Sequence, residues 1–261
     1  MHRGIRVGQY IPSDSILHNL EARTKIIASI FMLVFIIVAS FPYKLLALSL
    51  PVIFLLKISQ VRFFIYLEAL RPFALIILLT VILQVLLVKG TPCYSLGIIT
   101  ITWEGLILAA AISIRLVLLL VVIRILTATT TPQQLMAALE KLLKPFTYIG
   151  LPVQELVMIM TISIRFIPLF IEEASRLSLA QQARGIDYGS GSIKQRIRAI
   201  SSLLIPLLRV AFNRASDIAI AMETRCYNGG LGRTYLHNFA MTKTDYVFLA
   251  VLLFIGVFVL A

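Results

Sequence analysis

The sequence predicts an all-α integral membrane protein with about five transmembrane helices and a cytoplasmic or interfacial region of long, kinked, amphipathic helices. Of its 261 residues, 59% are hydrophobic and only 14% are charged, whereas a soluble domain is nearer half apolar and a quarter charged. Long apolar runs recur along the chain, and the mean hydropathy is +0.95. The net charge of +12 comes from Lys and Arg that gather in a few segments. In a membrane protein such cations set orientation, so nucleic acid is not an expected partner.

Five apolar runs are the candidate spans. They cover 26–41, 45–56, 73–88, 106–126 and 246–261. Several are shorter than the roughly 20 residues that a perpendicular helix needs, so local thinning of the bilayer or burial against other subunits must accommodate them. The chain then divides into a cytoplasmic N-terminal segment (1–25), spans one to four (26–127), a cytoplasmic region of long amphipathic helices (128–243) and a C-terminal span (244–261).

The distribution of Lys and Arg predicts the orientation of these spans. With the N-terminus inside, four cations lie in the N-terminal segment, three between spans two and three, and thirteen in 127–245, while only Lys44 and Lys89 lie outside. Because cytoplasmic loops are enriched in Lys and Arg, we expect a multi-pass protein of the cell (inner) membrane with its N-terminus in the cytoplasm and its C-terminus outside. Cys93 and Cys226 then lie on opposite sides of the membrane, which argues against a disulfide.

The first helix of the region 128–243 is indicated by its capping residues. Thr131 is a suitable N-cap, Pro132 fits the first helical position, and Gln134 follows the cap by three residues. We expect this helix to run to about Leu143, because Pro145 follows.

Two longer helices follow it. Their expected bounds are about Val153 to Arg184 and about Ile193 to Cys226, with Gly189-Ser190-Gly191 as the loop between them and Asn228-Gly229-Gly230 as the final terminator. Gly185 is placed to stop the first helix, and Pro168 and Pro206 should kink the two helices. Both helices are apolar in the middle and charged at the ends, yet Arg165 and Arg209 fall within the apolar parts. Partial embedding at the cytoplasmic interface, with packing on other subunits, accommodates both features.

The sequence offers no cluster of groups that would form an enzyme site. It has no Gly-x-x-x-x-Gly-Lys-Ser/Thr loop for ATP, and His2, His18 and His237 lie in polar flanks without metal-ligand spacing. Glu172 and Glu173 are adjacent, and neighbours on a helix do not share a face. We therefore expect no catalytic residue, metal or cofactor in this chain. A membrane-embedded enzyme and a stand-alone carrier are the alternatives, and a carrier would need polar residues inside several spans.

Arg115 lies in the middle of predicted span four. A charge at that depth is costly unless it is paired or faces a polar interior. It could line a substrate or ion path, or it could pair with Glu104 or with the carbonyl groups of another helix. Because no other span supplies acids for a path, the structural interpretation is favoured.

Arg184 and Arg225 are the candidate functional residues. Either one alone would be an ordinary cation near a helix C-terminus, where it favours the macrodipole. Together they end two similar helices, and small residues flank both: Ala183 and Gly185 around the first, Thr224 and Cys226 around the second. The planar guanidinium group suits a carboxylate in a pocket. The chain therefore presents two similar cationic contacts on the predicted cytoplasmic side, which fits a pair of similar partners.

Ordered motifs run almost the whole length of the chain. They are Pro12-Ser13-Asp14-Ser15, His18-Asn19-Leu20-Glu21-Ala22-Arg23-Thr24-Lys25, Thr129-Thr130-Thr131-Pro132, Ser163-Ile164-Arg165-Phe166-Ile167-Pro168, Gln181-Gln182-Ala183-Arg184-Gly185 and Ala221-Met222-Glu223-Thr224-Arg225-Cys226-Tyr227. This set resembles the EcfT/CbiQ family, the transmembrane (T) components of energy-coupling-factor transporters, which are ABC-type importers of vitamins and metals. The last two motifs are similar to the family's Ala-Arg-Gly motifs, although Thr224 and Cys226 replace the usual Ala and Gly in the second.

The resemblance implies a non-catalytic subunit that joins two cytoplasmic ABC-type ATPase subunits to one membrane-embedded substrate-binding (S) component. Ala183-Arg184-Gly185 and Thr224-Arg225-Cys226 would each dock in a groove of one ATPase, and ATP and Mg would be bound by the ATPases. Closure of the ATPases would then move the long coupling helices and reorient the S component, which carries the vitamin or other micronutrient. Candidate S-component contacts in the apolar middles are Leu156, Met160, Ile164, Leu203, Leu207 and Phe212. The lipid bilayer is the remaining expected partner.

Overall fold

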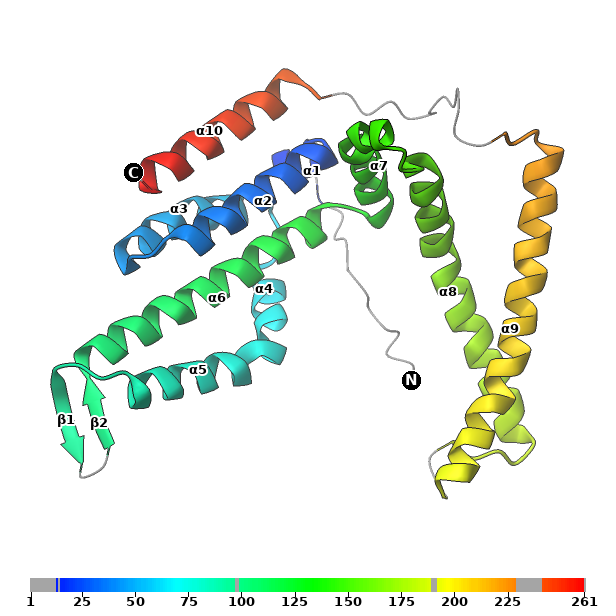
Figure 1. Ribbon diagram of the computed structural model, residues 1–261, viewed down its shortest axis with the longest axis horizontal. Helices are drawn as coiled ribbons and strands as arrows, with labels where there is room; N and C mark the ends of the chain where they lie inside the picture. The colour runs from blue at the N-terminus through cyan, green and yellow to red at the C-terminus, as the bar shows by residue number, and fades with distance from the viewer. Residues whose placement is uncertain (1–12, 14, 97–98, 189–191, 229–240, 261) are drawn as a thin grey trace. The chain divides into compact units, whose positions relative to one another are not determined.

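The computed structural model describes residues 13, 15–96, 99–188, 192–228 and 241–260, and it forms two compact units (Figure 1). Unit 1 comprises Met1–Leu142 and His237–Ala261, and unit 2 comprises Leu143–Leu236. Helices make up most of both units, which confirms the predicted helical class. The expected loop at Gly189-Ser190-Gly191 and the terminator at Gly229-Gly230 lie outside the described residues.

Unit 1 is built around one long helix. Its helices are α1 (Ile16–Asn19), α2 (Ala22–Val38), α3 (Pro42–Ile58), α4 (Phe63–Leu70), α5 (Ala74–Leu87), α6 (Trp103–Thr129), α7 (Pro132–Leu143) and α10 (Lys243–Leu260), with a 3₁₀ turn at Arg71–Phe73 between α4 and α5. Helix α6 packs against α2, α3, α4 and α5, and α10 packs against α2 and α3. The four helices α2, α3, α6 and α10 therefore share one core.

That core consists of closely packed aliphatic side chains. Met32 and Ile36 of α2 and Leu45 and Leu48 of α3 are almost completely buried. Leu118, Val121, Val122 and Ile125 of α6 and Leu252 of α10 belong to the same cluster. The side chains recur at helical spacing, so one stripe of each helix faces the common interior.

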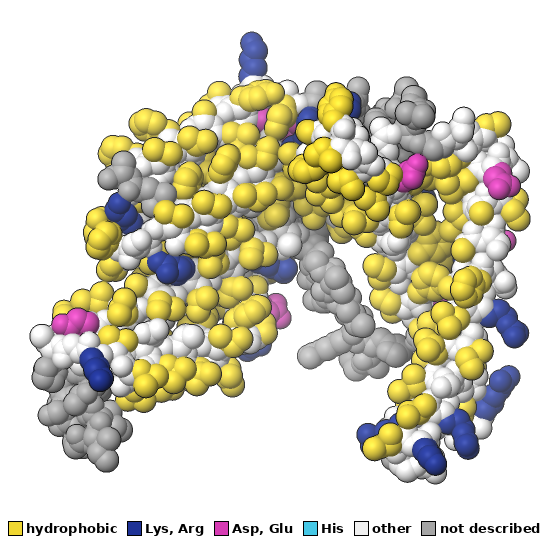
Figure 2. All heavy atoms as spheres, viewed as in Figure 1, with side chains coloured by type: hydrophobic (Ala, Val, Ile, Leu, Met, Phe, Trp, Pro, Cys, Tyr) yellow, Lys and Arg dark blue, Asp and Glu magenta, His cyan; other side chains and the backbone are white. Residues whose placement is uncertain are grey.

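Large apolar side chains also cover the outside of unit 1 (Figure 2). Leu75 and Leu87 of α5 and Phe254 and Phe258 of α10 are 70–75% exposed. An apolar surface of this extent marks contact with a membrane or another protein. The surface is therefore consistent with the predicted membrane location.

Three described helical stretches are long and apolar enough to cross a membrane by length and composition: Phe64–Leu87, Trp103–Thr129 and Val153–Ala183. The first two cover predicted spans three and four, whereas the third is the first long coupling helix, which we expected at the interface. Helices α2 and α3 have 17 residues each and are about 26 Å long at 1.5 Å per residue, slightly short of a hydrocarbon core of about 30 Å. Each predicted span thus coincides with a helix, while the number of spans stays a prediction.

A β-hairpin between α5 and α6 was not expected from the sequence. Strand β1 (Pro92–Leu96) pairs antiparallel with β2 (Ile99–Thr102), with Tyr94 opposite Ile101. Every residue of β2 is β-branched, which favours a pleated strand over a helix. By hydropathy this stretch is only a gap between two apolar runs, so hydropathy does not predict the hairpin.

Arg115 pairs with a backbone carbonyl group, one of the partners that the structural interpretation allowed. Its Nη2 atom donates a hydrogen bond to the carbonyl oxygen of Ala39, the C-cap of α2. A cation at a helix C-terminus also favours the macrodipole. Glu104, the other candidate partner, instead accepts hydrogen bonds from the backbone and side chain of Thr91 at 2.8 and 2.9 Å. Arg115 therefore joins α6 to the end of α2.

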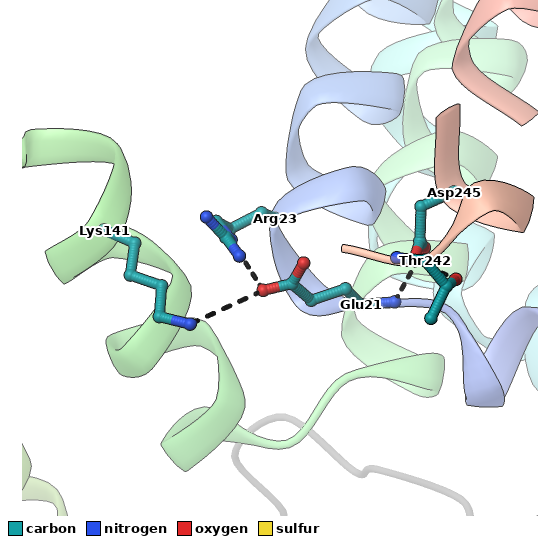
Figure 3. Close-up of polar contacts among 5 residues, drawn as sticks. All are labelled: Glu21, Arg23, Lys141, Thr242 and Asp245. Carbon is teal, nitrogen blue, oxygen red and sulfur yellow. Dashed lines mark hydrogen bonds and ion pairs between the residues drawn. The ribbon is translucent and has the colours of Figure 1, made fainter. Parts of the chain in front are cut away.

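Polar contacts before and at the start of α2 join segments that are far apart in the sequence (Figure 3). The Glu21 carboxylate accepts a hydrogen bond from Arg23 at 2.6 Å and lies 3.9 Å from the Lys141 ammonium of α7. Its backbone N–H donates to Asp245 of α10 at 3.0 Å, and Asp245 also accepts from Thr242. Burial, and next the Arg23 guanidinium, lower the pKa of Lys141. Glu21, in the motif of residues 18–25, therefore holds both α7 and the start of α10.

Helix α7 begins as the sequence predicted. The Gln134 N–H donates to the Thr131 hydroxyl at 3.2 Å, and the Thr131 N–H donates to the Gln134 side chain at 3.0 Å. Two otherwise unpaired backbone donors are thereby satisfied. Directly before this turn, the buried Lys25 ammonium donates to the carbonyl oxygens of His18 and Thr129 at 3.0 Å each. The connection between α6 and α7 is thus held by Lys25 at the end of α6 and by the capping box of Thr131 and Gln134 at the start of α7.

Candidate partner-binding site

Two long helices form most of unit 2. Helix α8 (Val153–Ala183) has 31 residues and α9 (Ile193–Thr224) has 32. Pro168 and Pro206 lie inside them without ending them. A 3₁₀ segment, Lys144–Ile149, precedes α8. The predicted helices are confirmed, with α9 ending two residues earlier than expected.

Helices α8 and α9 pack together where α8 ends and α9 begins, and they diverge away from that end (Figure 1). The Gln181 side chain donates a hydrogen bond to the carbonyl oxygen of Ser202 at 3.4 Å, and Ala199 is buried. Helix α9 starts with a capping box between Ser192 and Gln195. This Ser-x-x-Gln pattern could have been recognised in the sequence, because it is the same capping box that predicts the start of α7.

The first arginine motif forms the C-terminal turn of α8. Arg184 is the C-cap, with φ −86° and ψ 6°. The Ile186 N–H donates to the Gln181 carbonyl at 3.1 Å and the Gly185 N–H to the Gln182 carbonyl at 2.9 Å. Gly185 has φ 85°, the left-handed conformation that glycine adopts without strain. These features define a Schellman motif.

The second arginine motif repeats this geometry at the end of α9. Arg225 is the C-cap, with φ −94° and ψ 14°. The Tyr227 N–H donates to the Met222 carbonyl at 3.0 Å and the Cys226 N–H to the Glu223 carbonyl at 2.9 Å. Cys226 takes the left-handed position with φ 54°. The helix ends at Thr224 because Arg225 and Cys226 are used to form the turn.

Both turns are accessible to partners. Ala183, Arg184, Gly185, Thr224, Arg225 and Cys226 are all exposed, and neither guanidinium forms an ion pair within the described part of the chain. Each arginine can therefore offer its planar fork to a carboxylate. No group of three or more described His, Cys, Asp or Glu side chains is arranged to hold a metal ion. Cys226 is a free thiol, whereas the Cys93 side chain lies outside the described part.

The two turns are widely separated. Helix α9 has 32 residues and is about 48 Å long at 1.5 Å per residue. Its first turns lie beside the end of α8, so Arg184 and Arg225 lie near opposite ends of α9. This spacing suits two separate partner surfaces better than one compact site.

The structure groups some of the candidate S-component contacts. Leu156, Met160 and Ile164 recur every four residues on α8 and share a face. Leu203 and Leu207 share a face of α9 and are half-buried. Phe212 is 70% exposed, but five residues at 100° each place it about 140° around the helix from Leu207. It therefore does not extend the surface formed by the two leucines.

The fold and this site together define a helical membrane protein that carries two long, arginine-tipped helices. Residues 13–236 match the family model of the CbiQ cobalt transport proteins. The chain belongs to this EcfT/CbiQ family.

Its relatives in the family cover nearly the same length. It is 41% identical over 247 residues to a protein of Thermosediminibacter oceani, covering 93% of this chain and 92% of the relative. It is 37% identical over 240 residues to one of Bacillus subtilis, covering 92% and 91%. Both relatives are named energy-coupling factor transporter transmembrane protein EcfT.

Proposed function

We propose that this protein is the transmembrane coupling subunit of an energy-coupling-factor importer. It links ATP hydrolysis by two cytoplasmic ABC-type ATPase subunits to reorientation of one membrane S component that binds a vitamin or another micronutrient. The observation that carries the proposal is the repeated turn: Arg184 and Arg225 end two long helices with the same backbone geometry. Two equal contacts, widely separated, fit two similar ATPases.

The arginine-tipped turns are the proposed ATPase contacts. Each guanidinium forms a bidentate, charge-assisted hydrogen bond with a carboxylate in an ATPase groove. The small neighbours Ala183 and Gly185, or Thr224 and Cys226, allow the ATPase backbone to approach closely. ATP and Mg are bound by the ATPases, and this chain supplies no catalytic group. Its contribution is mechanical.

Movement of the ATPases is transmitted by α8 and α9. The helices pack at one end, through Gln181, Ala199 and Ser202, and diverge at the other. A displacement applied to the two tips therefore changes the separation of the helices or rotates one against the other. The S component rests on their apolar faces, with Leu156 and Met160 of α8, both 44% exposed, among the contacts.

The asymmetry of Lys and Arg supports the proposed orientation, in which the N-terminus and both arginine motifs face the cytoplasm and the C-terminus lies outside the cell membrane. This orientation is required by the mechanism, because the ATPases are cytoplasmic.

Affinity purification of the tagged full-length chain in mild detergent, followed by mass spectrometry, tests the proposal. Two ATP-binding subunits, or two copies of one, and a small hydrophobic protein should co-purify. The small protein would identify the transported substrate. Recovery of the chain alone from several gentle detergents, together with substrate uptake by the chain alone in liposomes, would instead support a stand-alone carrier.

A further inference from the structure

Gln181 takes part both in the first arginine turn and in the contact between the two long helices. Its carbonyl oxygen accepts hydrogen bonds from the Arg184 and Ile186 N–H groups at 3.1 Å each. Its half-buried side-chain amide donates to the Ser202 carbonyl oxygen of α9 at 3.4 Å. The residue whose backbone closes the Arg184 turn therefore also holds α9.

The Ser202 carbonyl group is available for this bond because Pro206 lies inside α9. In an α-helix, the carbonyl group of each residue accepts the N–H of the residue four positions later. Proline has no N–H, so the Ser202 carbonyl lacks its donor within the helix. A carbonyl group that is shielded from water and has no donor is unfavourable, and Gln181 supplies the donor from α8. The hydrogen bond between the helices thus depends on the proline.

The stretch of α9 around Pro206 is suited to bending. The hydroxyl groups of Ser201 and Ser202 donate to carbonyl groups of the preceding turn, at 2.8 and 2.7 Å. Such bonds bend helices, as does an internal proline. Pro206 and Arg225 are about 28 Å apart along α9 at 1.5 Å per residue. A change of about 10° in the bend would therefore move the second arginine turn by about 5 Å.

We propose that Gln181 is a positioning residue that links the Arg184 turn to the bend at Pro206. An ATPase that displaces Arg184 moves the backbone of Gln181, and the Gln181 amide carries this movement to α9 at Ser202. The Arg225 turn lies beyond the bend, so its position responds to the ATPase at the other turn. The source of the movement rests on the proposed function, whereas the link between the helices is a property of the chain alone.

Pulsed electron paramagnetic resonance on the full-length chain in detergent measures this link. One spin label is attached to Cys226, an exposed free thiol, and the other to Ile159→Cys, at a 61% exposed position near the start of α8, in a Cys93→Ser background. These positions lie on the parts of α8 and α9 that diverge (Figure 1). The distance between the labels therefore reports the angle between the helices.

Gln181→Met keeps the length of the side chain but removes its donor. It should shift and broaden the distance distribution, because a neutral hydrogen bond changes a two-state equilibrium about two- to tenfold. In a Pro206→Ala background, where residue 206 itself supplies the N–H to Ser202, Gln181→Met should have no effect. Gln182→Met, at the exposed neighbouring position, should leave the distribution unchanged. Pro168→Ala, the matched proline control on α8, should preserve the effect of Gln181→Met.

An unchanged distribution in Gln181→Met would overturn the proposal. An equal change in the Pro206→Ala background would also overturn it, because the contact would then be ordinary side-chain packing.

The assembled transporter tests whether the link carries movement. Gln181→Met should lower substrate uptake per ATP hydrolysed while ATPase affinity stays unchanged, because neither arginine is altered. Loss of stability alone would lower the amount of complex and leave this ratio unchanged, so an unchanged ratio would overturn the positioning role. If no ATPase binds the unmodified chain, the proposed function fails, and the distance measurement still decides whether Gln181 links the helices.

Discussion

Arg184 and Arg225 occupy the same position in two helix-terminating turns with matching hydrogen bonds, although Gly185 follows the first and Cys226 the second. Both following residues are in the left-handed region, at φ 85° and 54°. Glycine adopts this conformation freely, whereas another residue pays roughly 1–2 kcal/mol. The turn at Arg225 therefore forms although the left-handed conformation of Cys226 is unfavourable in free energy. Strain of this kind supports a functional role for the turn.

Replacement of either arginine should weaken binding of one ATPase. A charge-assisted hydrogen bond contributes about 1.5–3 kcal/mol, so Arg184→Ala or Arg225→Ala should lower ATPase affinity about 10- to 150-fold. Lys at either position keeps the charge but lacks the fork, and should give an intermediate loss. Binding of the purified ATPases to the full chain in detergent, together with substrate uptake in liposomes, measures the effect.

Arg176→Ala on α8 and Arg214→Ala on α9 are matched controls for this experiment, because both side chains are exposed cations on the same two helices. They should bind ATPases as the unmodified protein does. Normal uptake by the Arg184→Ala, Arg225→Ala double variant would show that these residues are not the coupling contacts.

The residue after each arginine should control the geometry of the turn. Gly185→Ala places a Cβ atom at positive φ. No described atom lies within 4 Å of that position, so the expected destabilisation of about 1 kcal/mol comes from the backbone alone. Cys226→Gly should relieve the same strain in the second turn. ATPase affinity and the free energy of unfolding of the variants measure both effects.

Cys226→Ala separates strain from thiol chemistry, because it retains a Cβ atom and removes the sulfur. It should behave like the unmodified protein. If Cys226→Ala and Cys226→Gly change stability equally, the left-handed backbone at residue 226 is not the cause.

The coupling helices could be located from the sequence because their ends are set locally. Thr131 and Gln134 cap α7 across three residues, and Gly185 ends α8 within one turn. Such signals are present in any short window of sequence. The predicted end of α9, Cys226, lies two residues beyond the observed end, Thr224. A cysteine, unlike a glycine, does not indicate a left-handed residue in the sequence.

The contacts that assemble unit 1 could not be predicted in this way. The Glu21 N–H and Asp245 are 224 residues apart, and Lys141 reaches Glu21 from a different helix. Neither the hydropathy nor the helical periodicity of a segment specifies which distant segment it meets. The roles of Arg184 and Arg225 depend on partners outside this chain, and no local pattern in the sequence specifies a partner.

Loss of the Asp245 carboxylate should detach the start of α10. Its two oxygens accept hydrogen bonds from the Glu21 and Thr242 N–H groups, and the residue is almost completely buried. An amide offers only one acceptor oxygen, so Asp245→Asn should leave a buried donor unpaired and destabilise the protein by about 1–3 kcal/mol. Thermal unfolding in detergent measures this loss. Asp217→Asn, at an exposed position of α9, should have no effect, and equal behaviour of the two variants would contradict a structural role for Asp245.

Replacement of Arg115 distinguishes a packing role from a transport path. Its guanidinium donates to the Ala39 carbonyl at the end of α2, so Arg115→Met fills similar volume but leaves that buried acceptor without its donor. We expect a loss of about 1–3 kcal/mol in the free energy of unfolding, partly offset because a half-buried cation is no longer desolvated. Uptake per folded complex should stay unchanged, since the substrate is expected to be carried by the S component. A variant that remains as stable as the unmodified protein, assembles with its partners and yet fails to transport would place Arg115 on a path through this chain.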